Sequence, residues 1–422
     1  MINRKQIPTI IEFLKQETPI LKNCFLLKKK IPFYLLNMSS QALINIDLIF
    51  ESGSWNESKV GEAFFCSKML LEGTTKKKSY EISEMIDFFG GTIAISSGVD
   101  HVQITTSCLN KFLSPMLEIL VEILSDSNFP EERLSHIKNL KKKSIQAENL
   151  DIMSVAKKQL REMIFSAKHP YGKSILEKNI EDLRLEDTKN YFQKKLFKNP
   201  KIFISGSYSD SEIEQISNLL NYINFESEEN SPVYSFERTK KDLQKSIRKE
   251  STQSAICLGR EVPLRSELDG IKIRIANIVL GGYFGSRLMK NIREKNGYTY
   301  GIHSRVINFK NNAMLMISSE IKKGFEEKTF EQIYLEIEKL QKEPLPDSEL
   351  KNVKKYIMGT MKLNMDNPFS VMEKLKDLKI NNICDDFYEK FQDDVFSVTQ
   401  SDIMEVVNKY FSKENISSVV VN

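Results

Sequence analysis

The chain has 422 residues, of which 41% are hydrophobic and 28% charged, and its formal net charge at pH 7 is +4. This length predicts two or more domains, and the composition is typical of a soluble globular protein. Because the net charge is small and lysines alternate with acids, the composition argues against a dedicated nucleic-acid-binding protein.

The beginning of the chain shows no targeting signal. Residues 1–19 place charged and polar side chains where a secretory signal needs an apolar run. The most apolar helical stretch, residues 116–124, is too short to span a bilayer and is interrupted by glutamates, so no membrane partner is expected. Five scattered cysteines without a C-x-x-C pair favour a reducing compartment. We therefore expect a cytoplasmic protein. A trimmed or mis-started N-terminus would hide a signal, which leaves the periplasm open.

The first half of the chain alternates strands with helices. Its periodicity predicts a strand, a buried helix, a second helix, a hairpin and a further strand, in this order: residues 45–53, 61–74, 79–89, 92–109 and 202–208. Gly73 stands where a left-handed cap is expected to end the buried helix, and Asp210 can cap a helix that follows the last strand. The lysine run 141–143 is predicted as the solvated face of a helix.

The second half repeats this alternation. Residues 254–262 are predicted as a strand, residues 273–297 as a helix, loop and helix, and residues 301–321 as a hairpin. This mixture indicates an α+β fold with helices packed on sheets. The loop LGGYFG at residues 280–285 lacks the G-K-[ST] of a phosphate loop and is predicted as a turn.

Two segments indicate an internal duplication. Residues 130–151 and 346–366 both open with proline and acids and end at an aspartate, and their matching leucines, Leu134 and Leu350, are 216 residues apart. A repeat at about half the chain length indicates two homologous domains. The polar, charge-dense stretch 225–249 is the predicted linker, which gives domains at residues 1–225 and 250–422.

The buried helix at residues 61–74 resembles the zinc-site helix of the insulinase/pitrilysin peptidases. In that family the helix carries H-x-x-E-H, with two histidines on one face to hold zinc and a glutamate as general base. Here Phe64 and Lys68 stand at the histidine positions and Ser67 at the glutamate position. The family's third ligand, a later glutamate, aligns with Ile145, and Glu148 lies nearby as an alternative. The resemblance therefore implies a degenerate metal site, with no zinc held by this chain. His101, His136, His169 and His303 are at least 33 residues apart and offer no helical ligand pair.

The stretch 280–304 resembles the C-terminal-domain signature of the same family. The resemblance covers essentially the whole chain, including H-P-Y-G at residues 169–172. In the family an arginine and a tyrosine of this signature contact the substrate, and here they are Arg293 and Tyr300. The resemblance implies that Arg293 binds substrate carbonyls and that the Tyr300 hydroxyl stabilises an oxyanion. The structural alternative is that Arg293 is an ordinary surface residue and Tyr300 a core residue of a strand.

The resemblance implies two homologous domains, each a mainly antiparallel sheet with helices packed on it, arranged as half of a clam-shell. We expect a non-catalytic subunit of a heterodimeric zinc metallopeptidase. Its partners would be a homologous H-x-x-E-H subunit, which carries the zinc, and a peptide substrate. One alternative is a structural member of the same fold with no peptidase role. Another is an enzyme with a relocated or metal-free site.

Overall fold

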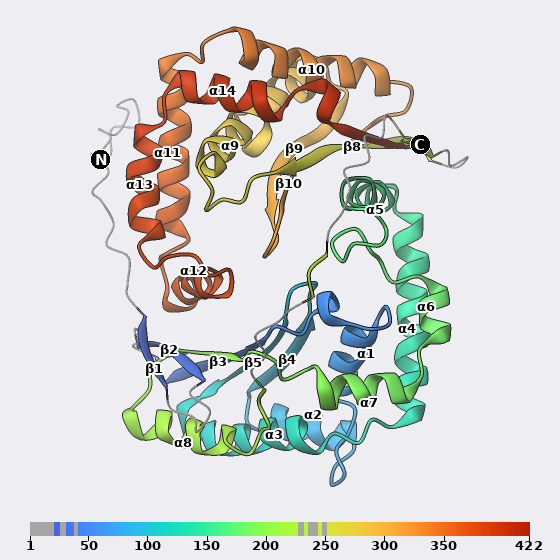
Figure 1. Cartoon of the computed structure of the whole chain (residues 1–422), viewed down its shortest axis with the longest axis vertical. Coiled ribbons are helices and arrows are strands. Elements are labelled where there is room, and N and C mark those ends of the chain that lie inside the picture. The colour runs from blue at the N-terminus through green and yellow to red at the C-terminus, as the bar shows by residue number, and fades with distance from the viewer. Residues whose placement is uncertain (1–20, 26–30, 38–40, 227–231, 235–243, 247–250) are drawn as a thin grey trace, which may run out of the picture.

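The two halves of the chain each build one β-sheet. The computed structural model describes residues 21–25, 31–37, 41–226, 232–234, 244–246 and 251–422. Figure 1 shows the sheet of the first half at the bottom of the molecule and that of the second half at the top, with helices on both faces of each. The predicted α+β fold is confirmed.

The sheet of the first half has the strand order β1-β2-β6-β3-β5-β4. Its neighbouring strands are antiparallel except for the parallel pair β2 and β6. The predicted hairpin is the pair β4 and β5, and the alternating burial along β5 shows that one face of this hairpin lies against the core. The strands are β1 (Lys22–Phe25), β2 (Pro32–Asn37), β3 (Leu43–Phe50), β4 (Thr92–Ser97), β5 (Val102–Leu109) and β6 (Lys201–Gly206).

The sheet of the second half has the order β7-β11-β8-β10-β9, which repeats the order β2-β6-β3-β5-β4 of the first. Its one parallel pair, β7 and β11, stands at the position of β2 and β6. Matching strand order and direction are what the predicted duplication requires. The strands are β7 (Gln244–Ser246), β8 (Gln253–Val262), β9 (Thr299–Asn308), β10 (Ala313–Lys322) and β11 (Ser417–Val421).

The helices follow the same repeated plan. Those of the first half are α1 (Glu62–Met69), α2 (Ser79–Phe88), α3 (Leu113–Asp126), α4 (Glu131–Leu150), α5 (Ile152–Phe165), α6 (Glu177–Asp182), α7 (Leu185–Lys194) and α8 (Asp210–Leu220). Those of the second half are α9 (Gly270–Asn277), the π-helical segments η3 (Ile278–Gly282) and η4 (Met289–Lys295), α10 (Glu326–Lys342), α11 (Asp347–Leu363), α12 (Pro368–Ile380), α13 (Phe387–Ser397) and α14 (Gln400–Tyr410). Short 3₁₀ turns lie at Ser54–Asn56, Asn110–Phe112 and Lys413–Asn415.

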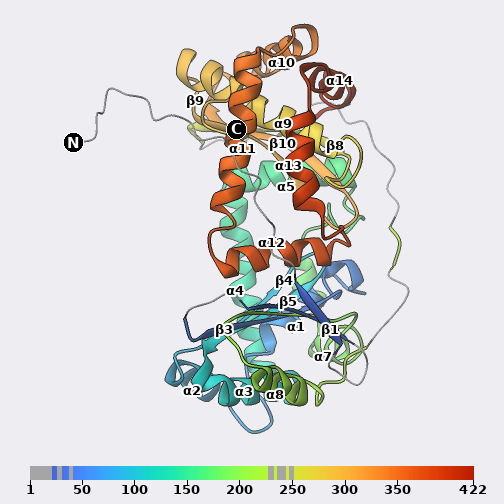
Figure 2. The same cartoon turned by 90° about the vertical axis from the view of Figure 1, so that its left-hand side faces the viewer.

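Each half sends one helix to the sheet of the other half. Helix α4 leads into α5, which packs on β8 and β11 of the second sheet, and α11 leads into α12, which packs on β6 and β2 of the first. Figures 1 and 2 both show α5 and α12 in the space between the two sheets. The two repeated segments are therefore the helices that precede these crossings, and Pro130 and Pro346 both stand at their N-caps.

Two predicted helix ends are wrong. Helix α1 ends at Met69 with Leu70 as its C-cap, whereas Gly73 lies beyond the helix and pairs with Lys78 in an isolated bridge. The cap of α8 is Ser209, whose Oγ accepts a hydrogen bond from the backbone N–H of Glu212 at 3.3 Å, and Asp210 is the first helical residue. The serine takes the cap because Glu212 completes a capping box with it.

The predicted linker lies largely outside the described residues, but residues 225–226, 232–234 and 244–246 are placed, and the last two of these parts contact the folded chain as follows. Strand β7 pairs with β11, and Trp55 Nε1 donates a hydrogen bond to the carbonyl of Pro232 at 2.8 Å. The Tyr234 hydroxyl donates to the carbonyl of Trp55 at 3.0 Å. These two parts of the stretch are therefore held against the folded chain. None of the helices in the described part of the chain has the length and hydropathy that crossing a membrane requires.

Candidate functional site

The helix with the degenerate motif, α1, packs beside α4, the helix that carries the position assigned to the third ligand. Phe64 is half-buried and packs edge-to-face on Phe65, with ring centroids 5.1 Å apart. The Lys141 ammonium of α4 lies 5.2 Å from the centroid of the Phe64 ring. A phenyl ring and an ammonium therefore occupy the space between the two helices.

The other two motif positions carry no metal chemistry. Ser67 is buried, and its hydroxyl donates a hydrogen bond to the carbonyl of Ala63 at 2.7 Å, so it acts only within its own helix. Lys68 is exposed. On α4, Ile145 is buried, and Glu148 accepts hydrogen bonds from Ser144 at 2.8 Å and Lys141 at 3.4 Å.

These residues do not fit a zinc ion. Zinc requires nitrogen, sulfur or carboxylate donors, and Phe64, Lys68 and Ile145 offer none in their ordinary protonation states. Within the described ranges, no three His, Cys, Asp or Glu side chains are grouped so that they could hold a metal.

A basic cleft of about 520 Å³ opens between α4, α5 and the strands β9 and β10. Among the described residues that line it, Glu148 is the one acid, and the bases are Lys141, Lys157, Lys158, Arg161 and Lys173. Burial lowers the pKa of Arg161. The lysine run was predicted as a solvated face, which is wrong for Lys141, because its side chain is 18% exposed and faces this cleft. The local charge opposes binding of a cation and favours an anionic group.

A smaller pocket of about 190 Å³ adjoins the cleft and contains Glu57. The two cavities share Lys173, Ser174 and Ile175 in their walls. Burial raises the pKa of Glu57 to about 7, although its carboxylate accepts a hydrogen bond from the backbone N–H of Gly61 at 2.9 Å. Sequence reasoning missed this group, because one glutamate in the loop ESGSWNES carries no pattern that predicts burial.

Arg293 and Tyr300 lie away from the basic cleft, on the second half of the chain. Tyr300 belongs to the edge strand β9, and its side chain is 91% exposed, so the alternative that it is a core residue is wrong. Arg293 is on η4, with its guanidinium carbon 4.8 Å from the centroid of the Phe284 ring, which is itself 65% exposed. Neither residue is among those that line the cleft beside Phe64. Within one chain, the structure does not bring the predicted pair and the degenerate motif together.

Comparisons with known proteins agree with the fold described above. A family model described as Insulinase (Peptidase family M16) matches residues 34–178, and one described as Peptidase M16 inactive domain matches residues 182–357. A Helicobacter pylori protein described as non-peptidase homolog YmxG is 23% identical over 327 residues, which cover 75% of this chain and 74% of that protein. The uncharacterized zinc protease YmxG of Bacillus subtilis is 24% identical, with 74% and 76% covered.

Solved structures show the same architecture. A peptidase M16 inactive-domain structure from Pseudomonas fluorescens superposes with a TM-score of 0.83 at 20% identity, covering 95% of this chain and 98% of that one. A structure described as a protease from Helicobacter pylori gives a TM-score of 0.85 at 17% identity, covering 96% and 100%.

Proposed function

Because the chain belongs to the insulinase family of peptidases (family M16), we propose that it is a non-catalytic subunit of a heterodimeric zinc metallopeptidase. In this proposal its partner is a homologous chain that carries H-x-x-E-H and the zinc ion. Arg293 and Tyr300 then act on the peptide bound at that partner's zinc. The exposure of Tyr300 is the observation that carries the proposal.

Tyr300 has no evident structural task in its own chain. Its ring is 91% exposed, and its hydroxyl makes no hydrogen bond with any residue in the described ranges. An aromatic side chain at an edge strand with a free hydroxyl is suited to contact another molecule. A tyrosine hydroxyl can donate a hydrogen bond to the oxyanion that develops when a peptide bond is attacked.

Arg293 is similarly available for a partner molecule. It forms no ion pair with a carboxylate in the part of the chain that the structure describes, and its guanidinium lies over the exposed Phe284 ring. Stacking on an aromatic ring occupies the face of a guanidinium and leaves the N–H groups at its edge able to donate. Arg293 can therefore bind peptide carbonyls or a carboxylate with two parallel hydrogen bonds. The two side chains thus offer the two kinds of contact that the family signature implies.

The degenerate motif supports assigning the zinc to a partner. Phe64, Ser67 and Lys68 provide neither zinc ligands nor a general base, and the neighbouring cleft is lined mainly by lysines and an arginine. The Helicobacter pylori relative described as a non-peptidase homolog points in the same direction.

Reconstitution with a homologous H-x-x-E-H chain from the same genome tests the proposal. The Tyr300→Phe variant should assemble normally and lower the turnover of a peptide substrate by about 10²–10³-fold, the usual effect of removing an oxyanion donor. Arg293→Ala should in addition raise KM. Tyr222→Phe is the matched control, because Tyr222 is also exposed, at 75%, and lies on the other half. If Tyr300→Phe and Arg293→Ala both assemble and keep full peptidase activity, the chain is a scaffold.

A further inference from the structure

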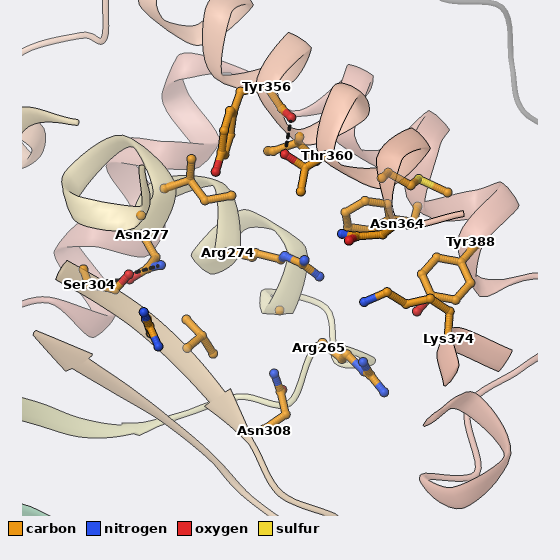
Figure 3. A pocket seen from close by; sticks show the side chains of 18 of the residues that line it. Arg265, Arg274, Asn277, Ser304, Asn308, Tyr356, Thr360, Asn364, Lys374 and Tyr388 are labelled. Atoms are coloured by element: carbon orange, nitrogen blue, oxygen red, sulfur yellow. Dashed lines mark hydrogen bonds between the residues drawn. The ribbon is translucent and has the colours of Figure 1, made fainter. Parts of the chain in front are cut away.

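A third cavity, of about 420 Å³, lies wholly within the second half of the chain (Figure 3). Its walls come from the segment before α9, from α9 itself, the far end of β9, and helices α11, α12 and α13. Its volume is within the range of sites that bind small molecules. Arg293 and Tyr300 are not among its lining residues, so it is separate from the surface considered above.

Positive charge gathers in this cavity without acids to balance it. Arg265, Arg274, Arg305 and Lys374 are among the described residues that line it, and no aspartate or glutamate is. Arg265 is paired with Asp377 just outside the lining, with 2.5 Å between nitrogen and oxygen. Arg274 and Lys374 make no hydrogen bond or ion pair with any residue that the structure describes. Arg305 has no such partner either, so three of the four cations have no ion pair among the described residues, although the Asp377 carboxylate also attracts Arg274.

Arg274 and Lys374 point into the same space. Figure 3 shows the Arg274 guanidinium entering from α9 and the Lys374 ammonium from α12 on the opposite side. The guanidinium carbon of Arg274 lies 5.4 Å from the centroid of the Phe391 ring, which fixes its direction. Arg274 is itself exposed, so an anion can reach its guanidinium from solvent.

Uncharged groups complete a binding surface. The side-chain amides of Asn308 and Asn364 and the hydroxyl of Tyr388 have no hydrogen-bond partner among the described residues, and all three line the cavity. Asn277 and Ser304, by contrast, are bonded to each other: Asn277 Nδ2 donates to the Ser304 carbonyl at 3.1 Å, and the Ser304 hydroxyl donates to Asn277 Oδ1 at 2.5 Å. The apolar part of the wall includes Ile278, Ile357, Met361, Met365 and Phe391.

The place of this cavity in the fold has a counterpart in the first half. Helix α9 follows β8 as α1 follows β3, and α11 flanks this cavity as α4 flanks the cleft beside Phe64. The predicted repeat aligns α4 with α11, so both hollows lie beside helices that the repeat relates. In the second-half cavity, three of the four cations have no ion pair among the described residues.

We propose that this cavity binds a small organic anion that carries phosphate or carboxylate groups. One anionic group lies between Arg274 and Lys374, the amides of Asn308 and Asn364 donate to its remaining oxygens, and the body of the ligand packs on the apolar wall. Charged donors and amides in this number suit a multivalent oxyanion. The proposal stands independently of the role given to Arg293 and Tyr300.

Titration calorimetry on the full chain at low salt, with pyrophosphate and with citrate as probes and chloride as the reference anion, tests this site. We expect saturable binding of at least one probe, weakened about 10- to 100-fold by Arg274→Gln and by Lys374→Gln, because each removes a charge-assisted hydrogen bond. Lys362→Gln is the matched control, since Lys362 is an exposed lysine of α11 outside the cavity. Circular dichroism and urea unfolding establish that each variant is folded.

Three outcomes would overturn the proposal. The first is that neither probe binds the wild-type chain at millimolar concentration. The second is that a probe binds and folded Arg274→Gln and Lys374→Gln retain wild-type affinity. The third is that a polyglutamate peptide binds in an Arg274-dependent manner while both small probes fail, which would make the occupant an acidic protein segment. A probe that binds the wild type and is weakened by both variants and not by Lys362→Gln supports the site.

Discussion

The two halves of this molecule share one order of strands but differ in the chemistry by which each holds the other's crossing helix. Helix α5 lies on the second sheet through apolar side chains, among them Leu160 and Ile164, which pack with residues of β8 and β11. A Cβ on Gly259 would lie 3.1 Å from Leu160 Cδ2 and 3.4 Å from Ile164 Cδ1. The glycine thus lets the helix approach the strand closely.

Helix α12 lies on the first sheet around a buried ion pair. Lys376 Nζ is 3.0 Å from Asp47 Oδ2, and the two side chains are 3% and 1% exposed. Asp47 also accepts hydrogen bonds from Thr105 at 2.5 Å and Asn45 at 3.1 Å. A repeated topology therefore does not fix the chemistry of a contact. Both crossings pack apolar side chains, since Leu375 of α12 is buried in one cluster with Tyr34 and Phe203 of the first sheet. The α12 crossing also contains the buried ion pair, which depends on each partner being present.

Breaking the ion pair on one side should have the largest effect. In Lys376→Met the Asp47 carboxylate stays buried without its counter-charge, so the free energy of unfolding should fall by about 3–5 kcal/mol in urea titrations. The double variant Asp47→Asn/Lys376→Met should recover most of this loss, because an amide is far less costly to bury than an unpaired carboxylate. Equal losses in the single and double variants would show that the ion pair is not what holds α12.

Truncating the apolar crossing should cost somewhat less. Leu160 is fully buried between α5 and the second sheet, and Leu160→Ala should lower the free energy of unfolding by about 2–5 kcal/mol through lost burial and a residual cavity. Leu363→Ala is the control, because Leu363 is 76% exposed at the end of α11 and its change should stay within about 0.5 kcal/mol. An effect of Leu160→Ala no larger than that of the control would mean that α5 is loosely packed.

The buried Glu57 makes the hollow of the first half sensitive to pH. Because burial raises its pKa from 4.5 to about 7, the folded chain binds this proton more tightly than the unfolded chain does. The resulting stabilisation is complete below about pH 4.5 and is lost as the pH rises through about 7. Glu57→Gln cannot ionise. The free energy of unfolding of this variant, measured relative to that of the wild type, should therefore rise by up to about 3 kcal/mol between about pH 4 and pH 8 in urea titrations. A difference that does not vary with pH would contradict this assignment.

The smallest effect is expected when the motif in α1 is restored, because the zinc content of the chain should hardly change. The triple variant Phe64→His/Ser67→Glu/Lys68→His recreates H-x-x-E-H, but Ile145 still stands at the third ligand position and basic side chains still line the adjoining cleft. We expect the variant, like the wild-type chain, to hold far less than one zinc per molecule in elemental analysis after dialysis. Stoichiometric zinc in the wild-type chain, removable by a chelator, would contradict the assignment of the metal to a partner.

Local sequence patterns were sufficient for the repeating elements of this fold. The alternation in residues 92–109 and 301–321 correctly predicted two hairpins, since every second side chain of a half-buried strand meets the core. The matching segments at 130–151 and 346–366 correctly marked the two long helices that precede the crossings. Helix ends were less secure. Gly73 and Asp210 are common cap residues, but Leu70 and Ser209 hold those places. At Ser209 the reason is the neighbouring Glu212, which completes a capping box.

The sequence by itself determined the side-chain chemistry at positions 64, 67 and 68: Phe64, Ser67 and Lys68 are not ordinary zinc ligands, because the chemistry of a ligand belongs to the side chain. Only the tertiary structure decided which surfaces meet. Contacts between distant segments determine the exposure of Tyr300, the ion pair between residues 47 and 376, and the cavity that Arg274 and Lys374 both line. Periodicity reports that a face is buried or exposed, but the partner across that face is set by long-range packing.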